Sequence, residues 1–355
     1  QWQADILNAS EVIEIEDVRF ANDSLWIRMP VFDSEFQLVL QGDGQLLGSF
    51  FNYSRGLDYQ IPARAKKAEV PRFSTTAADF AIEGKWEAVF SDGTEDEYPA
   101  VGVFTSEADY IAGTFLTETG DYRFLEGSVS GDSLKLSCFD GAHAFLFEAK
   151  LTGDTLRGTF WSGNHWEEPF WMVRNAEAAL RSPEELTYLK DGYNKLSFSF
   201  PDLEGTPVSL DDTRFDDKVV VIQIMGSWCP NCLDETKLYK EWYDRYHDQG
   251  LEIVALAFER SRGDLSLAQR NVKRLVDKLG LEYPFLIAAT ENNKAGASAK
   301  LPMLNAIISY PTSIFLDRQG NIRRIHTGFN GPGTGEVYLR YREEYEAFLE
   351  KLLAE

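Results

Sequence analysis

Two of the chain's three cysteines stand close together in the segment GSWCPNCLDET, residues 226–236. Thiols at this spacing serve either as half of a zinc site or as a reversible disulfide. A structural zinc site needs four ligands, usually as two close pairs. The sequence holds no second CxxC, and its four histidines are scattered without metal-binding spacing. We therefore favour a redox pair over zinc and over two inert buried cysteines, and we expect no metal and no other cofactor.

The expected surroundings of the pair support the redox interpretation. The apolar run VVVIQIM, residues 219–225, predicts a buried strand directly before the pair, and a helix is expected to begin at it. Unpaired N–H groups and the dipole at a helix start stabilise a thiolate, which lowers the pKa of the first cysteine. We expect Cys229 to be the exposed nucleophile and Cys232, one turn later, to be the resolving thiol. Pro230 suits the first helical position because it has no N–H, and Trp228 would cover one side of the sulfur.

Three segments of the second half form a recognisable set: FSFPDLEGTPVSLDDTRFDDKVVVIQIMGSWCPNC, which ends at the cysteine pair, YPTSIFLDRQGNI, residues 310–322, and CLDE, residues 232–235. By these segments, residues 196–355 resemble a thioredoxin-fold domain of the TlpA/ResA type, the exported thiol–disulfide oxidoreductases. The resemblance implies a cis peptide at Pro311, packed opposite the disulfide. It also implies that the backbone of Tyr310 binds an extended substrate by strand addition. The substrate-binding residues would then be Trp228, Pro230, Asn231, Tyr310 and Pro311.

Glu235 is the candidate general base of the pair. It lies three residues after Cys232 on the same face of the expected helix. A partly buried carboxylate with a raised pKa can take the proton from Cys232 as that thiol attacks a mixed disulfide. The alternative is an ordinary Glu that the helix dipole favours in the first turn. In ordinary thioredoxins the base is a buried aspartate six residues before the first cysteine, and here Gln223 holds that place.

The residues between the cysteines bear on the direction of electron flow. They are Pro230 and Asn231, whereas many reducing members of the resembled family have a proline second. Intervening residues tune the relative stability of thiolate and disulfide. The family resemblance implies a reductase, and an oxidase or isomerase remains the alternative.

The rest of the chain predicts two different architectures. Residues 1–175 consist of short strand-like runs with turns, and DSLWIRM…FQLVLQGDGQLLGSF (23–50) repeats as DSLKLSC…FLFEAKLTGDTLRGTF (132–160). We expect a duplicated antiparallel meander that closes into a barrel, with a two-sheet sandwich as the alternative. Residues 176–195 are interpreted as a helical connector, and residues 196–355 as an α/β thioredoxin-like domain.

Composition narrows the function further. The formal net charge of −22 argues against nucleic acid as a partner, because binding there relies on Lys and Arg. No apolar run approaches the roughly 20 residues that span a bilayer. The chain starts without Met, so we expect a processed or trimmed product. The family resemblance implies an exported protein that acts in the periplasm or cell envelope.

The expected function is reduction of protein disulfides. A separate thiol donor, with a membrane-bound one as a candidate, would recharge the pair. A third hypothesis is a barrel that binds a ligand or partner and carries a tethered redox domain. Cys138 is interpreted as buried filler, because its partner in the repeat is the apolar Met29.

Overall fold

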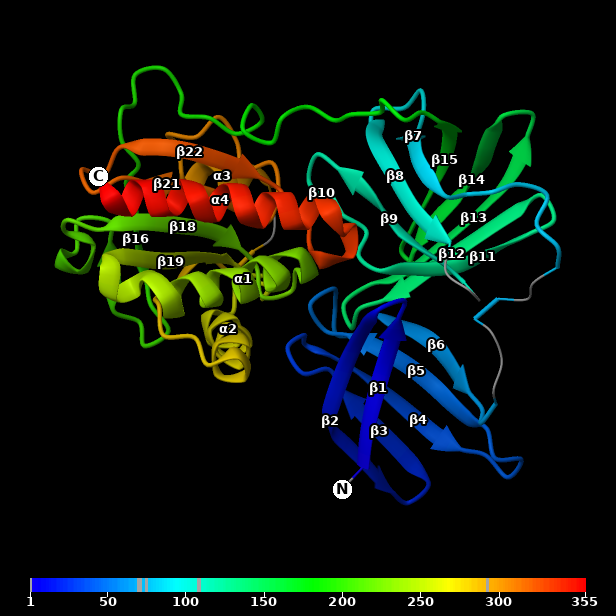
Figure 1. Cartoon of the computed structure of the whole chain (residues 1–355). Helices are drawn as coiled ribbons and strands as arrows, with labels where there is room; N and C mark the ends of the chain where they lie inside the picture. Colours follow the sequence, from blue (N-terminus) through cyan, green and yellow to red (C-terminus); the bar gives the residue numbers. More distant parts are fainter. Residues whose placement is uncertain (1, 69–71, 74–75, 107–109, 292–293) are drawn as a thin grey trace. The chain divides into compact units, whose positions relative to one another are not determined.

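The computed structural model describes residues 2–68, 72–73, 76–106, 110–291 and 294–355 (Figure 1). The chain forms two compact units. Unit 1 contains residues 1–117 and 121–180, and unit 2 contains residues 118–120 and 181–355. Among the helices of the described ranges, none is both long enough and apolar enough to cross a membrane.

Unit 1 begins with a six-stranded antiparallel meander in which each strand pairs with the next along the chain. Its strands are β1 (Trp2–Asn8), β2 (Glu11–Ala21), β3 (Ser24–Arg28), β4 (Ser34–Leu40), β5 (Leu46–Asn52) and β6 (Gln60–Ala65). Among the described pairings, β1 and β6 each have a single neighbour, so this sheet is open. Pro62 in β6 suits an edge strand, because proline has no N–H to offer a further neighbour.

The second sheet of unit 1 is a closed barrel of eight strands. Its strands, with the short β10 added beside β9, are β7 (Gly84–Phe90), β8 (Tyr98–Ser106), β9 (Ile111–Thr117), β10 (Gly120–Asp121), β11 (Leu125–Ser130), β12 (Ser133–Phe139), β13 (Ala144–Thr152), β14 (Thr155–Ser162) and β15 (Trp166–Arg174). Consecutive strands pair around the barrel, including β8 with β9, and pairing of the last strand, β15, with the first, β7, closes the ring. Closure leaves no exposed strand edge on the barrel.

Side chains occupy the interior of this barrel. Strand alternation directs Leu134, Leu136 and Cys138 of β12 inward, and each of the three is at most 2% exposed. They pack in one core with fully buried phenylalanines such as Phe115 and Phe147. A filled interior gives no support to the hypothesis of a ligand-holding barrel.

The predicted all-β front with its internal repeat is confirmed. Both copies are three-stranded meanders, β3–β5 and β12–β14. Gly48 and Gly158 correspond in the repeat, and at each a Cβ atom would lie 2.0 Å from a carbonyl oxygen of the neighbouring strand, that of Gln37 or Glu148. Only the second copy lies in the closed barrel, whereas the first belongs to the open sheet.

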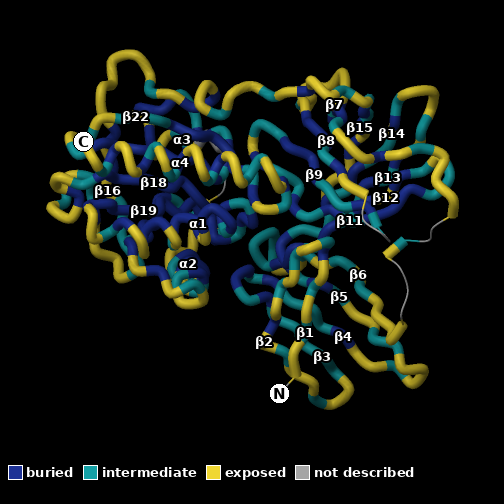
Figure 2. The backbone as a smooth tube through the Cα atoms, viewed as in Figure 1, coloured by how far each residue is buried: buried dark blue, intermediate teal, exposed yellow. Residues whose placement is uncertain are grey.

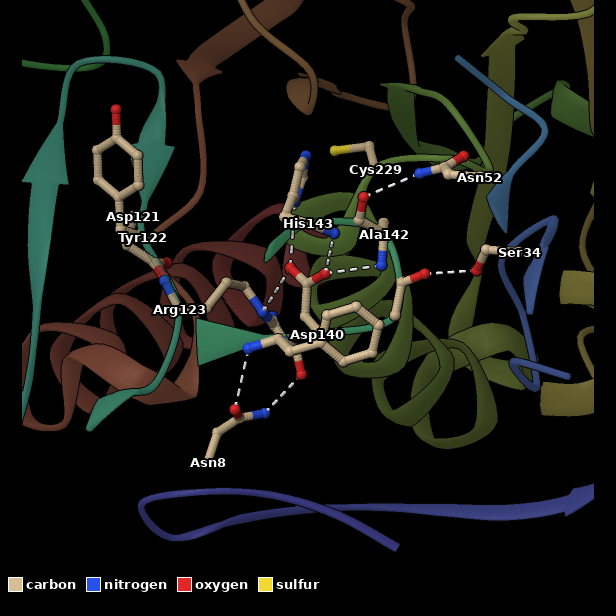
Figure 3. Close-up of polar contacts among 12 residues, drawn as sticks. Asn8, Ser34, Asn52, Asp121, Tyr122, Arg123, Asp140, Ala142, His143 and Cys229 are labelled. Carbon is tan, nitrogen blue, oxygen red and sulfur yellow. Dashed lines mark hydrogen bonds and ion pairs between the residues drawn. The ribbon is translucent and has the colours of Figure 1, made fainter. Parts of the chain in front are cut away.

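The loop at residues 139–143 is held by buried polar contacts within unit 1 (Figure 3). Asn8 exchanges two hydrogen bonds with the backbone of Phe139, at 2.9 and 3.0 Å. Asn52 donates to the Ala142 carbonyl at 2.9 Å. The Asp140 carboxylate accepts from the backbone N–H groups of Ala142 and His143 and contacts the His143 ring at 3.1 Å. Because their polar groups are paired, these residues can be buried without a large desolvation cost.

The prediction of a helix in the connector 176–195 is wrong. The segment consists of turns and extended stretches, and Leu189 forms an isolated bridge with Leu304. Tyr188 and Asn305 bond through their backbones at 2.9 Å, and Lys190 donates to the Met303 carbonyl at 2.8 Å. Pairing with residues 303–305 thus takes up the backbone groups that a helix would use internally, and tertiary contacts override local propensity.

Unit 2 is a five-stranded sheet with helices, in the order β20-β19-β18-β21-β22. Its elements are the hairpin β16 (Ser199–Pro201) and β17 (Pro207–Ser209), the strands β18 (Val219–Met225), β19 (Leu251–Phe258), β20 (Phe285–Ala289), β21 (Thr312–Leu316) and β22 (Ile322–Thr327), and the helices α1 (Pro230–Tyr246), α2 (Leu265–Leu279), α3 (Lys294–Lys300) and α4 (Glu336–Ala354). β18 runs parallel to β19 and antiparallel to β21. The predicted thioredoxin-like α/β fold is confirmed.

Every residue of the two central strands β18 and β19 is buried, as Figure 2 shows in dark blue. Helix α4 packs on β21 through ring contacts of Phe315 with Tyr345 and Phe348. Gln223 and Ser313 lie opposite each other in register on β18 and β21. Both bond Glu235 of α1, so α1 lies on the same face of the sheet as Ser313. The active-site segment therefore starts at the end of the central strand β18, whose residues are all buried.

Candidate active site

The cysteine pair occupies the start of α1, as predicted. Cys229 is the N-cap in extended conformation, Pro230 is the first helical residue, and the Cys232 N–H donates to the Cys229 sulfur at 3.2 Å. The two cysteines form a disulfide with their Cα atoms 5.2 Å apart. Cys229 was expected to be exposed, yet only 7% of its surface is accessible. Cys232 has no accessible surface, so Cys229 presents the sulfur that another molecule can reach.

The predicted substrate-binding residues surround Cys229. The Tyr310–Pro311 peptide is cis, as expected. The Cys229 sulfur lies 3.5 Å from the Tyr310 carbonyl oxygen. The rings of Trp228 and Tyr310 meet edge to face with centroids 5.6 Å apart. Asn231, the second of the two residues between the cysteines, donates to the Phe329 carbonyl at 3.1 Å, and this bond fixes its side chain.

Glu235 lies on α1, three residues after Cys232, and has no accessible surface. One carboxylate oxygen accepts from Gln223 Nε2 at 2.8 Å. The other accepts from the hydroxyls of Ser313 at 2.9 Å and Tyr239 at 3.3 Å. Burial raises the pKa of Glu235 to about 7, although all three hydrogen bonds act to lower it. A carboxyl group with this pKa can both accept and release a proton at neutral pH.

Gln223, at the place of the usual aspartate, takes part in this network as a hydrogen-bonding residue. Its amide nitrogen donates to Glu235 and lies 3.5 Å from the Cys232 carbonyl oxygen. Its amide oxygen accepts from the Thr236 hydroxyl at 3.1 Å. The carboxyl group of this network thus lies on the helix, at Glu235, and Gln223 on the strand holds it in place.

A second buried carboxylate beside the active-site segment, Glu259, was not predicted from the sequence. It follows β19, is 1% exposed, and accepts from the N–H and the hydroxyl of Ser227, both at 2.7 Å. Burial raises the pKa of Glu259 to about 7, against the opposing effect of the Ser227 hydrogen bonds and the Arg260 charge. The only signal in the sequence is an acidic residue directly after the apolar run LEIVALAF.

The third cysteine and the histidines do not join the site. Cys138 is a free thiol in the barrel core, and burial raises its pKa well above the ordinary value. Among the described residues, no group of three or more His, Cys, Asp or Glu side chains could hold a metal ion.

Comparison with known proteins covers the second half of the chain. A family model described as Redoxin matches residues 191–338. The thiol-disulfide oxidoreductase ResA of Halalkalibacterium halodurans is 30% identical over 142 residues, which are 39% of this chain and 68% of that protein. The protein of the same name from Bacillus thuringiensis subsp. konkukian is 31% identical over 144 residues, which are 41% of this chain and 73% of that protein.

Solved structures also resemble this half. A thiol:disulfide interchange protein of the thioredoxin family from Chlorobium tepidum aligns over 46% of this chain and 99% of its own, with 19% identity and a TM-score of 0.33. The family assignment rests on the ResA sequence relatives. The chain belongs to the ResA thiol–disulfide oxidoreductases and is an oxidoreductase that carries a CxxC-spaced cysteine pair on a thioredoxin-like fold.

Proposed function

We propose that this protein reduces disulfides in other proteins of the cell envelope, with Cys229 as the nucleophile. The Cys229 thiolate attacks one sulfur of a substrate disulfide, so that a mixed disulfide forms and one substrate thiolate leaves. Cys232 then attacks the Cys229 sulfur, and the second substrate thiolate leaves. The substrate gains two electrons, and the pair Cys229–Cys232 becomes a disulfide.

Glu235 is the base for the second step in this proposal. Cys232 has no accessible surface, so bulk water cannot take its proton. Glu235 lies three residues after Cys232 on α1, and hydrogen bonds from Gln223 and Ser313 hold its carboxylate in place. Its pKa of about 7 matches it to proton transfer at neutral pH.

The direction of electron flow is inferred from the buried carboxylates Glu235 and Glu259, and this observation carries the proposal. A strongly oxidising pair needs a stabilised thiolate, because that stabilises its reduced form. The ionised fraction of these two carboxyl groups has the opposite effect, since it disfavours a further anion nearby. The disulfide form of the pair is then relatively stable, and the reduced pair tends to give its electrons away.

Substrate binding is proposed to use the backbone beside the disulfide. An extended chain would pair with the backbone of Tyr310, while the ring of Trp228 packs beside it. Backbone pairing gives affinity with little dependence on the substrate's sequence. A thiol donor must return electrons to the pair after each turnover, and a membrane-bound donor in the envelope is our candidate.

The test combines a redox titration with a trapping variant. Equilibration with glutathione or dithiothreitol should give a reduction potential near the thioredoxin value of about −270 mV. A value near about −120 mV, as for a strong oxidant, would reverse the proposed direction. Cys232→Ser should accumulate mixed disulfides with envelope proteins through Cys229, whereas the matched double variant Cys229→Ser/Cys232→Ser should trap none. If the two variants behaved alike, protein disulfides would not be the substrates.

A further inference from the structure

The residues at the end of β19 hold the two residues that precede the nucleophile. Glu259 accepts both the N–H and the hydroxyl of Ser227, each at 2.7 Å. The carbonyl of Phe258 accepts from the Trp228 indole nitrogen at 2.9 Å. The guanidinium of Arg260 lies over the Trp228 ring, 3.4 Å from its centroid. Three consecutive residues thus contact Ser227 and Trp228 through one carboxylate, one carbonyl and one cation.

The turn that they hold leaves little freedom. The Cys229 N–H donates to the Gly226 carbonyl at 3.1 Å, which closes a tight turn directly before α1. A Cβ atom at Gly226 would lie 2.4 Å from the Trp228 indole nitrogen and 3.0 Å from the Phe258 carbonyl oxygen. The turn and the end of β19 are therefore packed in direct contact, and displacement of Ser227 would carry the Cys229 sulfur with it.

A buried carboxylate is a costly way to hold a turn. Transfer of a charge from water into a protein is unfavourable unless hydrogen bonds or opposite charges compensate it. Ser227 supplies two donors to Glu259, and the positive charge of the neighbouring Arg260 also favours its ionised form. A neutral side chain could fill the same volume at less cost. This points to a requirement on geometry: a carboxylate offers two acceptors side by side, matched to the two donors of one serine.

We propose that Glu259 is a positioning residue for Cys229. Its carboxylate fixes Ser227 and thereby sets the place of the Cys229 sulfur beside the Tyr310 carbonyl. The inference rests on the proposed function, because it assumes that Cys229 is the nucleophile. It adds a residue that follows β19 and bonds Ser227, whereas Glu235 lies on α1 and contacts Gln223, Ser313 and Tyr239.

The variants Glu259→Gln and Glu259→Ala separate geometry from charge. In Glu259→Gln the amide oxygen can accept the Ser227 N–H while the amide nitrogen donates to the Ser227 hydroxyl, so both contacts persist without charge. In Glu259→Ala both contacts are lost. Ser227→Ala removes only the hydroxyl contact. The matched control is Glu252→Ala, since Glu252 is also a buried carboxylate of β19 but lies at its other end.

The readout is the second-order rate constant of the reduced full-length protein with a small aromatic disulfide, measured against pH. We expect Glu259→Ala to lower this rate constant roughly tenfold or more, because small misplacement of a reacting group costs one to two orders of magnitude. Ser227→Ala should lower it roughly threefold, which is an intermediate effect. Glu259→Gln, which keeps both contacts to Ser227 but lacks the charge, should lose much less than Glu259→Ala, and the control Glu252→Ala should stay within about twofold of the wild type.

Two results would overturn the inference. One is wild-type reactivity in Glu259→Ala, or in Ser227→Ala should the first variant fail to fold. The other is a loss in Glu259→Gln as large as that in Glu259→Ala, which would assign the effect to charge. Failure of the proposed function gives a different result: the wild-type Cys229 would then react no faster than a free cysteine, and Cys232→Ser would trap no protein.

Discussion

The stability of unit 2 in Glu235→Gln, measured relative to the wild type, is expected to be greater at alkaline pH than at acidic pH. Burial raises the pKa of Glu235 from its ordinary value of 4.5 to about 7. The folded protein therefore keeps a proton in the range where the unfolded chain has lost it, so stability falls as pH rises from about 4.5 to about 7. The full penalty above pH 7 is about 3 kcal/mol, and about 2.5 kcal/mol of it develops between pH 5 and pH 8.

The network around Glu235 can accommodate the glutamine. If the Gln223 amide rotates, its oxygen faces the new amide nitrogen while its own nitrogen donates to the Thr236 hydroxyl. Ser313 and Tyr239 can keep donating to the remaining oxygen. The substitution thus removes the charge and the titration with little change in packing, and the difference between pH 5 and pH 8 isolates the ionisation.

Hydrogen exchange of the amides in β18 and β19 is the suitable assay. These strands belong to unit 2, and one overall free energy of unfolding is not well defined for a chain of two compact units. The opening free energy of Glu235→Gln minus that of the wild type should rise by about 2.5 kcal/mol from pH 5 to pH 8. Glu241→Gln, an exposed site on the same helix, should change it by less than about 0.5 kcal/mol. If Glu235→Gln behaved like Glu241→Gln, the carboxylate would not be ionising in a buried site, and its proposed role as base would lose its physical basis.

Further predictions concern the site, the barrel and the last helix. Ser313→Ala removes a donor to the Glu235 carboxylate, so the pKa of Glu235 should rise further by about one unit, seen as a shift in the pH dependence of substrate release. Gly158→Ala should lower the stability of the barrel by about 3 kcal/mol or prevent folding, because its Cβ would meet the Glu148 carbonyl, whereas Gly42→Ala has open space around it and should change thermal unfolding little. Leu349→Ala should cost about 2–5 kcal/mol by hydrogen exchange in unit 2, since Leu349 is fully buried on α4, while Leu339→Ala, 48% exposed on the same helix, should stay within about 0.5 kcal/mol. An equal effect of the two leucine variants would contradict the packing described for α4.

The sequence contained strong local information about the redox site. The spacing of Cys229 and Cys232 after an apolar run is a short-range pattern, and the strand-to-helix transition follows directly from it. The cis peptide before Pro311 came from the resemblance to a family, since an X-Pro dipeptide by itself favours trans. Glu235 could be named because helical periodicity relates it to Cys232.

Features that depend on distant contacts could not be predicted in this way. Glu259 lies 32 residues from Ser227, its hydrogen-bonding partner, and no local pattern connects the two. The connector 176–195 has the composition of a helix, yet pairing with residues 303–305 gives it an extended course. The repeat predicts two meanders but not which one closes, because closure depends on whether the last strand finds the first. β15 pairs with β7 to complete one ring, and β6 with Pro62 ends the other sheet.

Because Cys138 is buried inside the barrel, the number of thiols that react with an added reagent reports whether the barrel is folded. An aromatic disulfide added to the folded, reduced chain should react at Cys229, and attack by Cys232 on the mixed disulfide should then release a second equivalent of aromatic thiolate. Cys138 should stay unmodified, because a thiol enclosed by aromatic side chains and held protonated does not react. A third equivalent of thiolate, from reaction at Cys138, would be released only when unit 1 opens. The same reagent thus measures redox state by the first two equivalents and unfolding of the barrel by the last, without any added label.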